Sequence, residues 1–221
     1  MNALGGDNLT VLRCLRQRAL SQSHPIFVVG GPVRDILISA PIRDLDFVVE
    51  GDGPEVARWL AEQLGGEVRV HPRFGTSTFI LGSCRVDVVT ARSETYAAPA
   101  ALPTVTPGSI SDDLARRDFT INALAYPLTP KTLLKDTAVF DKSHVVDLHD
   151  GLSDLKDKVI RTVGDPNDRF GEDALRLLRA VRFAAQLDFA IESNTLVSLT
   201  FNAQRLQNIA VERIADEFNK L

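Results

Sequence analysis

Residues 30–52 read GGPVRDILISAPIRDLDFVVEGD, and the interpretation of the whole chain depends on this stretch. It opens with two glycines, and further on Asp44 and Asp46 lie one residue apart at the start of an apolar run. Residues i and i+2 of a strand point to the same face, so the two carboxylates would project together while Leu45 and Phe47 turn into the core. Carboxylates held this close repel each other unless a cation lies between them. The stretch therefore suggests a metal site on a strand.

Aspartate oxygens suit Mg²⁺, which keeps several waters and commonly takes further ligands from substrate phosphates. Asp87, in the run VDVV, is a third candidate ligand if its strand neighbours the first. Three carboxylates can hold two Mg²⁺ ions roughly 3.5–4 Å apart, and such a pair activates an attacking hydroxyl and stabilises the leaving oxygen. The alternative is an ordinary strand end at which Asp46 pairs with Arg43 or Arg34. The Asp-x-Asp pattern alone does not decide between the two.

The glycines, Gly30 and Gly31, follow the apolar run 26–29 and precede a short helix-like stretch. Free N–H groups and the helix dipole favour an anion at such a position, and Arg34 would lie one turn inside, within reach of a phosphate. The alternative is a tight turn that needs a positive φ. A phosphate-binding turn close in sequence to a metal-binding pair would make a site for a nucleoside triphosphate.

The composition of the 221-residue chain is ordinary for a globular protein, with 44% hydrophobic and 24% charged residues. Its net charge of −4 provides no general basic field for nucleic acid. Cys14 and Cys84 lie far apart without histidines at metal spacing, which argues against a zinc site or a disulfide scaffold and fits a reducing compartment. No apolar run approaches the length of about 18 residues that a membrane span needs, and no signal-peptide core is evident. We therefore expect a soluble, cytoplasmic protein that does not enter a membrane.

Hydrophobic periodicity predicts an α/β region to about residue 150 and an all-helical region after it. Residues 97–109, rich in proline, are predicted to form a loop. The predicted helices are 9–20, 32–38, 54–64, a short one at the start of 110–126, 151–160, 171–187, and stretches near 193–200 and 209–221. The predicted strands are 26–29, 45–49, 67–70, 76–81 and 84–91.

The predicted helix over 171–187 has an apolar side and a polar side. The apolar side holds Ala174, Leu177, Leu178, Val181, Ala184 and Ala185. The other side holds Glu172, Arg176, Arg179 and Phe183, flanked by Asp173 and Arg182. Arginine and aspartate side chains can hydrogen-bond base edges with a directionality that lysine lacks, so this side is a candidate nucleobase-reading surface. The alternative is a solvated face with Glu172 and Arg176 as an i,i+4 pair.

A second basic cluster lies in the stretch 112–123, DDLARRDFTINA. Arg116 and Arg117 lie among acidic and apolar residues there, and Asn122 follows. Taken alone, this pattern is typical of an ordinary salt-bridge lattice.

Seven stretches together carry a resemblance to a known family. They are VVGGPVRDIL (28–37), RDLDFVV (43–49), FGTSTFIL (74–81), VDVVTARSETY (86–96), DDLARRDFTINALAY (112–126), the run 145–189 and VERIADEF (211–218). In this order and spacing they resemble the class II tRNA nucleotidyltransferase and poly(A) polymerase family, within the nucleotidyltransferase superfamily. The resemblance covers about residues 26–218.

The resemblance implies an α+β fold with two domains. A nucleotidyltransferase head domain, with a mixed β-sheet and helices, would occupy residues 1–140, and an all-α neck that recognises the nucleobase would occupy residues 141–221. Family members generally continue into helical body and tail regions that grip the tRNA. We expect both to be absent here, so the chain resembles a head-and-neck fragment or an unusually short member.

The resemblance also assigns roles to individual residues, in three groups. The carboxylates implied to be catalytic are Asp44, Asp46 and Asp87, of which Asp44 and Asp46 would bind Mg²⁺ in a two-metal site. The residues implied to bind the nucleotide are Gly30, Gly31, Arg34, Arg117, Asn122, Asp173, Arg176, Arg179 and Arg182. Those implied to recognise the base are Glu172, Asp173 and Arg176.

The activity implied is attack by an RNA 3′-hydroxyl on the α-phosphate of ATP or CTP, with release of pyrophosphate. The acceptor would be the 3′ end of tRNA, or another RNA 3′ end, and the enzyme would be of the CCA-adding type. The alternatives are a poly(A) polymerase or an A-adding enzyme of the same family, or a nucleotide-binding fragment without activity of its own.

Overall fold

The computed structural model of the chain describes residues 6–21, 24–42, 44–72, 75–95, 104–129 and 141–221. The chain divides into two compact units. The sheet unit comprises Met1–Ser93, Thr106–Leu114 and Leu124–Asp147, and the helical unit comprises Glu94–Val105, Ala115–Ala123 and Leu148–Leu221. The division into a head to residue 140 and a neck after it stays a prediction. Among the described residues, no helix is long and apolar enough to cross a membrane.

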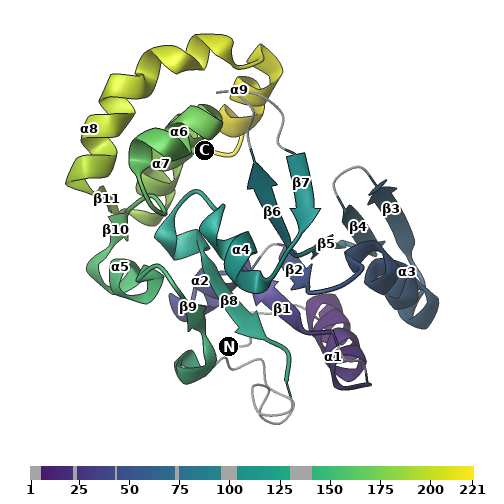
Figure 1. The fold of residues 1–221 in the computed structure, drawn as a ribbon. Coiled ribbons are helices and arrows are strands. Elements are labelled where there is room, and N and C mark those ends of the chain that lie inside the picture. The colour runs from purple at the N-terminus through teal and green to yellow at the C-terminus, as the bar shows by residue number, and fades with distance from the viewer. Residues whose placement is uncertain (1–5, 22–23, 43, 73–74, 96–103, 130–140) are drawn as a thin grey trace. The chain divides into compact units, whose positions relative to one another are not determined.

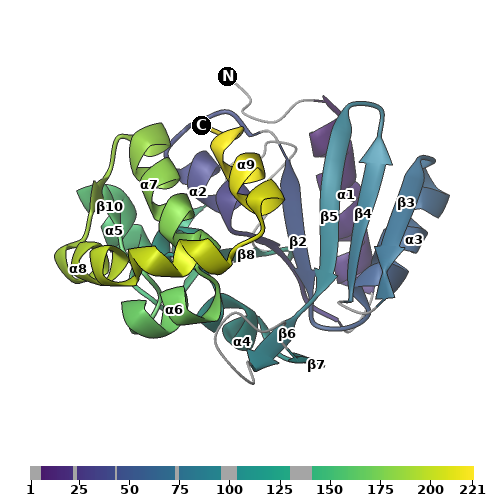
Figure 2. The ribbon, with the colours of Figure 1, turned by 90° about the horizontal axis from the view of Figure 1, so that it is seen from above.

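The sheet unit is built on one mixed sheet of seven strands, in the order β3-β4-β5-β2-β1-β8-β9. All neighbouring strands are antiparallel except β2 and β5, which are parallel. Figure 2 shows β2, β5, β4 and β3 running side by side. The strands are β1 (Ile26–Val29), β2 (Leu45–Val49), β3 (Glu67–His71), β4 (Thr76–Leu81), β5 (Cys84–Thr90), β8 (Leu124–Pro127) and β9 (Val146–Asp147).

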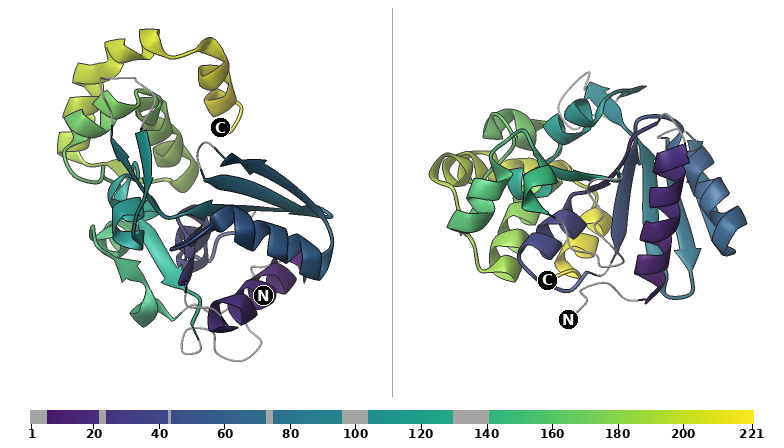
Figure 3. Two further views of the ribbon diagram at one scale, coloured as in Figure 1. Left: turned by 45° about the vertical axis from the view of Figure 1, so that its right-hand side comes forward. Right: turned by 90° about the horizontal axis from the view of Figure 1, so that it is seen from below.

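Helices cover both faces of this sheet. α1 (Gly6–Ser21) and α3 (Gly53–Leu64) lie side by side against one face (Figure 3), and α2 (Gly31–Leu37) follows directly after β1. α4 (Ile110–Ala115) packs on the opposite face. There its apolar residues meet alternate residues of the strands, in a cluster of Phe27, Val29, Val48, Ala91, Ile110, Leu114 and Ala125.

The strand residues that alternate with this cluster point towards α1 and α3. Leu45, Phe47, Phe79 and Val88 are completely or almost completely buried there. β2 is therefore apolar on both faces over most of its length, which explains why a continuous apolar run predicted it correctly. The expected burial of Leu45 and Phe47 is confirmed.

β6 (Arg92–Thr95) pairs with β7 (Thr104–Pro107) in a separate two-stranded sheet. The prediction of a loop was therefore wrong for residues 104–107, while residues 97–103 lie outside the described ranges. β-branched Thr and Val favour an extended backbone, and a proline is tolerated at the end of an edge strand. Between β8 and β9 the described chain contains the short 3₁₀ helix η3 (Lys142–His144).

In the helical unit, α6 packs against both α7 and α8, and α9 packs against α7 (Figure 1). Phe170, Ala174, Leu177 and Ile209 form a buried apolar cluster at its centre. The elements are η2 (Thr120–Asn122), α5 (Gly151–Asp157), β10 (Val159–Ile160), α6 (Pro166–Glu172), α7 (Leu175–Leu187), β11 (Ala190–Ile191), α8 (Ser193–Asn202), η4 (Ala203–Asn208) and α9 (Val211–Phe218).

Three details of the helical prediction were wrong. Strands do not cease after residue 150, because β10 and β11 pair in parallel. The helix predicted over 151–160 ends at Asp157, because the next residue, Lys158, has φ 57° in the left-handed region, and the chain continues as β10. The helix predicted over 171–187 is two helices, because Asp173 has an extended backbone with φ −148° and ψ 106°.

Candidate active site

The carboxylates predicted from β2 and β5 lie on neighbouring strands. In the parallel β2–β5 pair, Asp46 is the register partner of Asp87, so the condition under which Asp87 was a third candidate ligand, that its strand neighbours β2, is met. Asp46 and Val48 are two residues apart, so Asp46 is on the face that α4 covers further along. Asp44, exposed, directly precedes β2. The sheet thus presents Asp46 and Asp87 as a pair, with Asp44 at the strand entrance.

The three carboxylate groups are not gathered around one point. Asp87 Oδ1 accepts a hydrogen bond of 2.5 Å from Thr78 Oγ1, and its Oδ2 lies 3.6 Å from Nη2 of Arg85. Within the described ranges, no group of three or more His, Cys, Asp or Glu side chains is arranged to hold a metal ion. The donor chemistry nevertheless fits Mg²⁺, because the side chains next to each other here offer carboxylate oxygens.

Gly30 forms the turn between β1 and α2 with φ 71° and ψ −130°, a conformation that only glycine adopts without strain. Its N–H donates to the Leu124 carbonyl at 2.9 Å, and its carbonyl accepts from the Arg34 N–H at 3.1 Å. The positive φ that the tight-turn interpretation required is therefore present. Because its N–H is engaged with β8, Gly30 shapes the turn. The next backbone donor is the Gly31 amide, since Pro32 has no N–H.

Arg34 lies over this turn. A Cβ added to Gly31 would be 3.6 Å from Nη2 of Arg34, which places the guanidinium group beside the second glycine. The side chain is only 10% exposed, and its Nε donates to Oδ1 of Asp35 at 2.8 Å. The arginine is thus held next to the glycine turn.

The turn and the aspartates lie at the same end of the sheet. β1 and β2 are antiparallel, and Val28 is the register partner of Phe47. The residues that follow β1 are therefore beside the start of β2, where Asp44 and Asp46 lie. Arg43, the other suggested partner of Asp46, lies outside the described residues.

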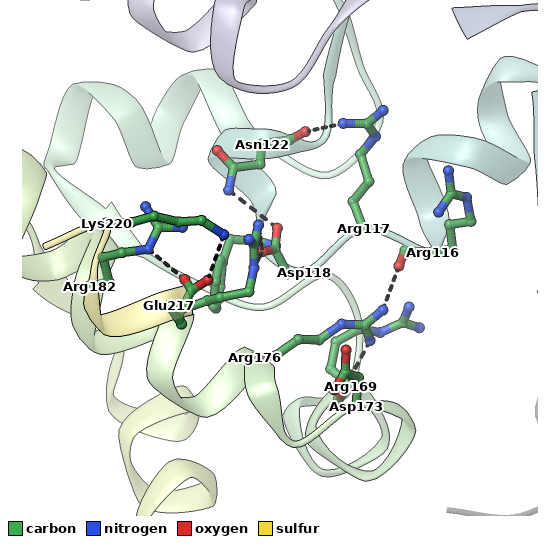
Figure 4. Close-up of polar contacts among 12 residues, drawn as sticks. Arg116, Arg117, Asp118, Asn122, Arg169, Asp173, Arg176, Arg182, Glu217 and Lys220 are labelled. Carbon is green, nitrogen blue, oxygen red and sulfur yellow. Dashed lines mark hydrogen bonds and ion pairs between the residues drawn. The ribbon is translucent and has the colours of Figure 1, made fainter. Parts of the chain in front are cut away.

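In the helical unit, the motif over 116–122 folds back on itself (Figure 4). Arg117 Nη1 donates to the Asn122 carbonyl at 3.3 Å, and Asn122 Nδ2 donates to Oδ1 of Asp118 at 3.2 Å. Asp118, which is 7% exposed, also accepts from Nε and Nη2 of Arg179 at 2.7 and 2.6 Å. Burial raises the pKa of Asp118, but Arg179 and the hydrogen bonds lower it by more, so the pKa lies below its usual value.

The residues predicted to read the base are brought together at the break between α6 and α7. Arg176 Nη1 donates to Glu172 at 2.5 Å and to the Arg169 carbonyl at 3.0 Å, and its Nη2 donates to the Arg116 carbonyl at 3.1 Å (Figure 4). Three of its five N–H donors are thus engaged within the described part of the chain, and two remain.

Asp173 is fixed at the same break. Its Oδ1 accepts from the Leu175 N–H at 3.1 Å, and its Oδ2 pairs with Arg213 of α9 at 2.8 Å. The side chain thereby satisfies a free amide at the start of α7, which is the physical reason why the predicted single helix is interrupted.

The predicted division of 171–187 into an apolar core side and an arginine surface was wrong. Val181 is 48% exposed, whereas Arg176 and Arg182 are buried. Arg182 Nε lies 2.5 Å from Oε1 of Glu217, which is 2% exposed, and the guanidinium carbon stands 4.1 Å from the centre of the Phe183 ring. Carboxylate partners allow these arginines to be buried.

Sequence reasoning missed Asp118, Arg213 and Glu217, which hold the predicted residues in place. Asp118 directly follows the paired arginines and precedes Phe119, so an acid inside an apolar stretch was the available signal. No local pattern marks the other two, because their partners lie 40 and 35 residues away in the sequence.

Comparisons with known proteins show which family the chain resembles. A family described as the poly A polymerase head domain matches residues 26–161, and one described as a probable RNA and SrmB-binding site of polymerase A matches residues 188–221. An A-adding tRNA nucleotidyltransferase of Halalkalibacterium halodurans is 37% identical over 225 residues, covering 100% of this chain and 50% of that protein. A CCA-adding enzyme of Pediococcus pentosaceus is 40% identical over 213 residues, covering 95% and 49%. The chain spans about half the length of these relatives.

Solved structures give the same result. A CCA-adding enzyme in an apo form matches with a TM-score of 0.82 and 34% identity, over 99% of this chain and 50% of that one. A tRNA nucleotidyltransferase complexed with a primer tRNA and an incoming ATP analog matches with a TM-score of 0.76 and 36% identity, over 93% and 55%. The expected α+β fold is thereby confirmed. On the strength of the head-domain match, the chain belongs to the tRNA nucleotidyltransferase and poly(A) polymerase family.

Proposed function

We propose that the chain carries the catalytic and base-reading parts of a template-independent RNA 3′-terminal nucleotidyltransferase that adds C, A or both to tRNA. The observation that carries this proposal is the register pairing of Asp46 with Asp87 beside the glycine turn over which Arg34 lies. Relatives described as A-adding and CCA-adding enzymes support the reaction class. The solved complex with primer tRNA and an ATP analog supports tRNA and ATP as substrates.

The chemistry is nucleotidyl transfer. The RNA 3′-hydroxyl oxygen attacks the α-phosphorus of ATP or CTP, the bond from that phosphorus to the bridging oxygen breaks, and pyrophosphate leaves. Nucleotidyltransferases generally use divalent metals, and Asp44 and Asp46 would hold Mg²⁺, with Asp87 as the third carboxylate. When bound, Mg²⁺ lowers the pKa of the attacking hydroxyl and neutralises triphosphate charge.

The remaining residues of the sheet unit and the motif over 116–122 orient the nucleotide. Gly30 sets the turn from which the Gly31 amide and the Arg34 guanidinium group meet the triphosphate. Arg117 and Asn122 contact phosphate or ribose. These groups hold the α-phosphorus in line with the attacking oxygen, which is the main task of a protein in phosphoryl transfer.

Base selection falls to the break between α6 and α7. Asp173 accepts a hydrogen bond from the exocyclic amine that C and A share, and the two remaining N–H donors of Arg176 meet a ring acceptor. Glu172 fixes Arg176, and Arg179 and Arg182 would bind the triphosphate. Both reading groups are anchored by other side chains, which supports a preorganised site.

We also infer a cytoplasmic location, because Cys14 and Cys84 are both free thiols and the substrates are nucleotides and RNA. CCA-adding activity is the first candidate for the reaction, and A-adding or poly(A) activity is the second.

The test is a primer-extension assay at single-nucleotide resolution. The chain, an Asp46→Asn variant and a control Glu67→Gln variant are each incubated with Mg²⁺ and ATP or CTP. The primers are tRNAs ending before CCA, after C and after CC, with oligo(A) as a control. Glu67 suits the control because it is an exposed acid at the edge of the sheet, 76% exposed.

The expected result is extension by the parent and Glu67→Gln but not by Asp46→Asn. Addition of C and then A identifies a CCA-adding enzyme, one A after CC an A-adding enzyme, and a long ladder a poly(A) polymerase. Extension by Asp46→Asn at the parent rate would refute the assigned carboxylates. Mg²⁺-dependent ATP binding without extension of any primer would favour a nucleotide-binding fragment.

A further inference from the structure

We propose that Thr78 is a positioning residue for the catalytic carboxylate of Asp87, an inference that rests on the proposed function. Thr78 lies on β4 and is the antiparallel register partner of Asp87 on β5. Asp87 is in turn the parallel register partner of Asp46 on β2. The three residues form one row across three neighbouring strands. Thr78 therefore lies next to Asp87, on the side away from Asp46.

The contact is a short hydrogen bond to a charged group. Oγ1 of Thr78 lies 2.5 Å from Oδ1 of Asp87, and an ionised carboxylate can only accept, so the hydroxyl donates. β4 lies between β3 and β5 and is paired along its length on both sides. Threonine is branched at Cβ, which restricts its side-chain rotation. The donor is therefore fixed by both its backbone and its side chain.

The other oxygen of Asp87 is held more weakly. Nη2 of Arg85 lies 3.6 Å from Oδ2, and the Arg85 side chain is 61% exposed, so water competes for it. A carboxylate offers about four acceptor sites, and the Thr78 hydroxyl occupies one of them. The hydrogen bond thus leaves acceptor positions for a cation while fixing the plane in which they lie. Partners of this kind change metal affinity or activity by about 10–100-fold when removed.

The same strand supplies a matched control. Thr76 lies two residues before Thr78, on the same face, and is also half-buried. Its register partner on β5 is Val89, an apolar residue, so no carboxylate stands opposite its hydroxyl. Replacing Thr76 by valine removes a hydroxyl from this face without touching Asp87.

The experiment compares Thr78→Val, Thr78→Ser and Thr76→Val with the parent chain. Three quantities are measured. Primer extension gives kcat and KM for ATP, and the free Mn²⁺ signal in electron paramagnetic resonance gives the affinity for Mn²⁺ in the presence of ATP. Thr78→Ala serves as a second variant without the hydroxyl if valine disturbs the strand. Thermal unfolding without metal checks that every variant is folded.

We expect Thr78→Val to lower kcat and Mn²⁺ affinity by about 10–100-fold with little change in KM for ATP. Thr78→Ser keeps the hydroxyl and should restore both values, and Thr76→Val should match the parent. Parent-like values for Thr78→Val, equal damage in Thr78→Ser, or equal damage in Thr76→Val would each overturn the inference. If the parent extends no RNA, the proposed function fails, and the Mn²⁺ affinities alone decide the role of Thr78. Absence of Mn²⁺ binding by the parent would overturn the inference as well.

Discussion

Replacing Asp118 by asparagine removes one charge of a buried ion pair and keeps the shape of the side chain. Its Oδ2 accepts from Arg179 at 2.7 and 2.6 Å, and its Oδ1 accepts from the Phe119 N–H at 2.8 Å and from Asn122 at 3.2 Å. Removing one partner of such a pair costs about 3–5 kcal/mol, because the other charge stays buried alone. Since Arg179 is 31% exposed, water solvates part of its charge. We therefore expect a loss near the lower limit, about 3 kcal/mol.

The loss should depend on pH. The pKa of Asp118 is raised by burial and lowered further by Arg179 and its hydrogen bonds, with a net decrease. A carboxyl whose pKa is lower in the folded state stabilises the protein above its unfolded pKa of about 3.9. That contribution is lost as the pH falls through the folded value. The difference between parent and variant should be complete at pH 7 and shrink below about pH 4.

The assay is urea denaturation monitored by circular dichroism, at pH 7 and at a pH below about 4. Parent, Asp118→Asn, Arg179→Gln and the double variant form a thermodynamic cycle, and the exposed Asp216→Asn serves as a control that should keep the parent midpoint. Two results would refute the reasoning: a loss below about 1 kcal/mol at pH 7, the size of an average substitution, or a loss that persists unchanged at low pH.

Three further perturbations have definite expected outcomes. Glu217→Gln should destabilise the helical unit by about 3–5 kcal/mol in urea denaturation, because it leaves Arg182 buried without its charge partner. Gly30→Ala should cost about 1–3 kcal/mol and reduce the stabilisation by Mg²⁺ and ATP in thermal unfolding, because alanine is strained at φ 71° and ψ −130°. Alkylation of Cys84 should be slow at pH 8, because burial, Asp7 and Asp44 raise the pKa of its thiol. Asp44→Asn should speed this alkylation, because it removes one of the charges that raise the pKa of the thiol.

Each of these has a control and a contradicting result. Glu212→Gln, exposed on the same helix, should not shift the urea midpoint, and an equal shift would argue against the buried pair. Gly6→Ala is the control for Gly30→Ala, because nothing lies within 4 Å of a Cβ added at Gly6. The turn argument would be contradicted if Gly30→Ala kept the stability of the parent and its stabilisation by Mg²⁺ and ATP. Unchanged Cys84 alkylation in Asp44→Asn would show that Asp44 lies elsewhere.

The sheet could be predicted from the sequence because its strands are marked by local patterns. β1, β2 and β4 coincide with the predicted residues, since runs such as LDFVV and TSTFIL are apolar, β-branched and bounded by turn residues. The adjacency of Asp46 and Asp87 could only be stated as a condition, because strand order depends on tertiary pairing.

The helical unit was less predictable because long-range charge pairs override the periodicity of α7. A helical wheel places Val181 in the core and the arginines in solvent, but Arg182 is buried against Glu217 and Val181 is exposed. At the break, Asp173 accepts a local hydrogen bond from the Leu175 N–H, but it is also held by Arg213, 40 residues away. No residue near the break indicates the contact with Arg213. The residue type was nevertheless informative, because arginines among acidic residues had suggested a salt-bridge lattice for Arg116 and Arg117.

The most direct test of the account is a crystal structure of the chain with Mg²⁺ and a non-hydrolysable ATP analog. The account predicts a metal ion about 2.1 Å from carboxylate oxygens of both Asp44 and Asp46. It also predicts that the triphosphate contacts the Gly31 amide and Arg34. A nucleotide bound elsewhere on the chain, or a metal that contacts neither aspartate, would contradict the assignment of this edge of the sheet as the active site.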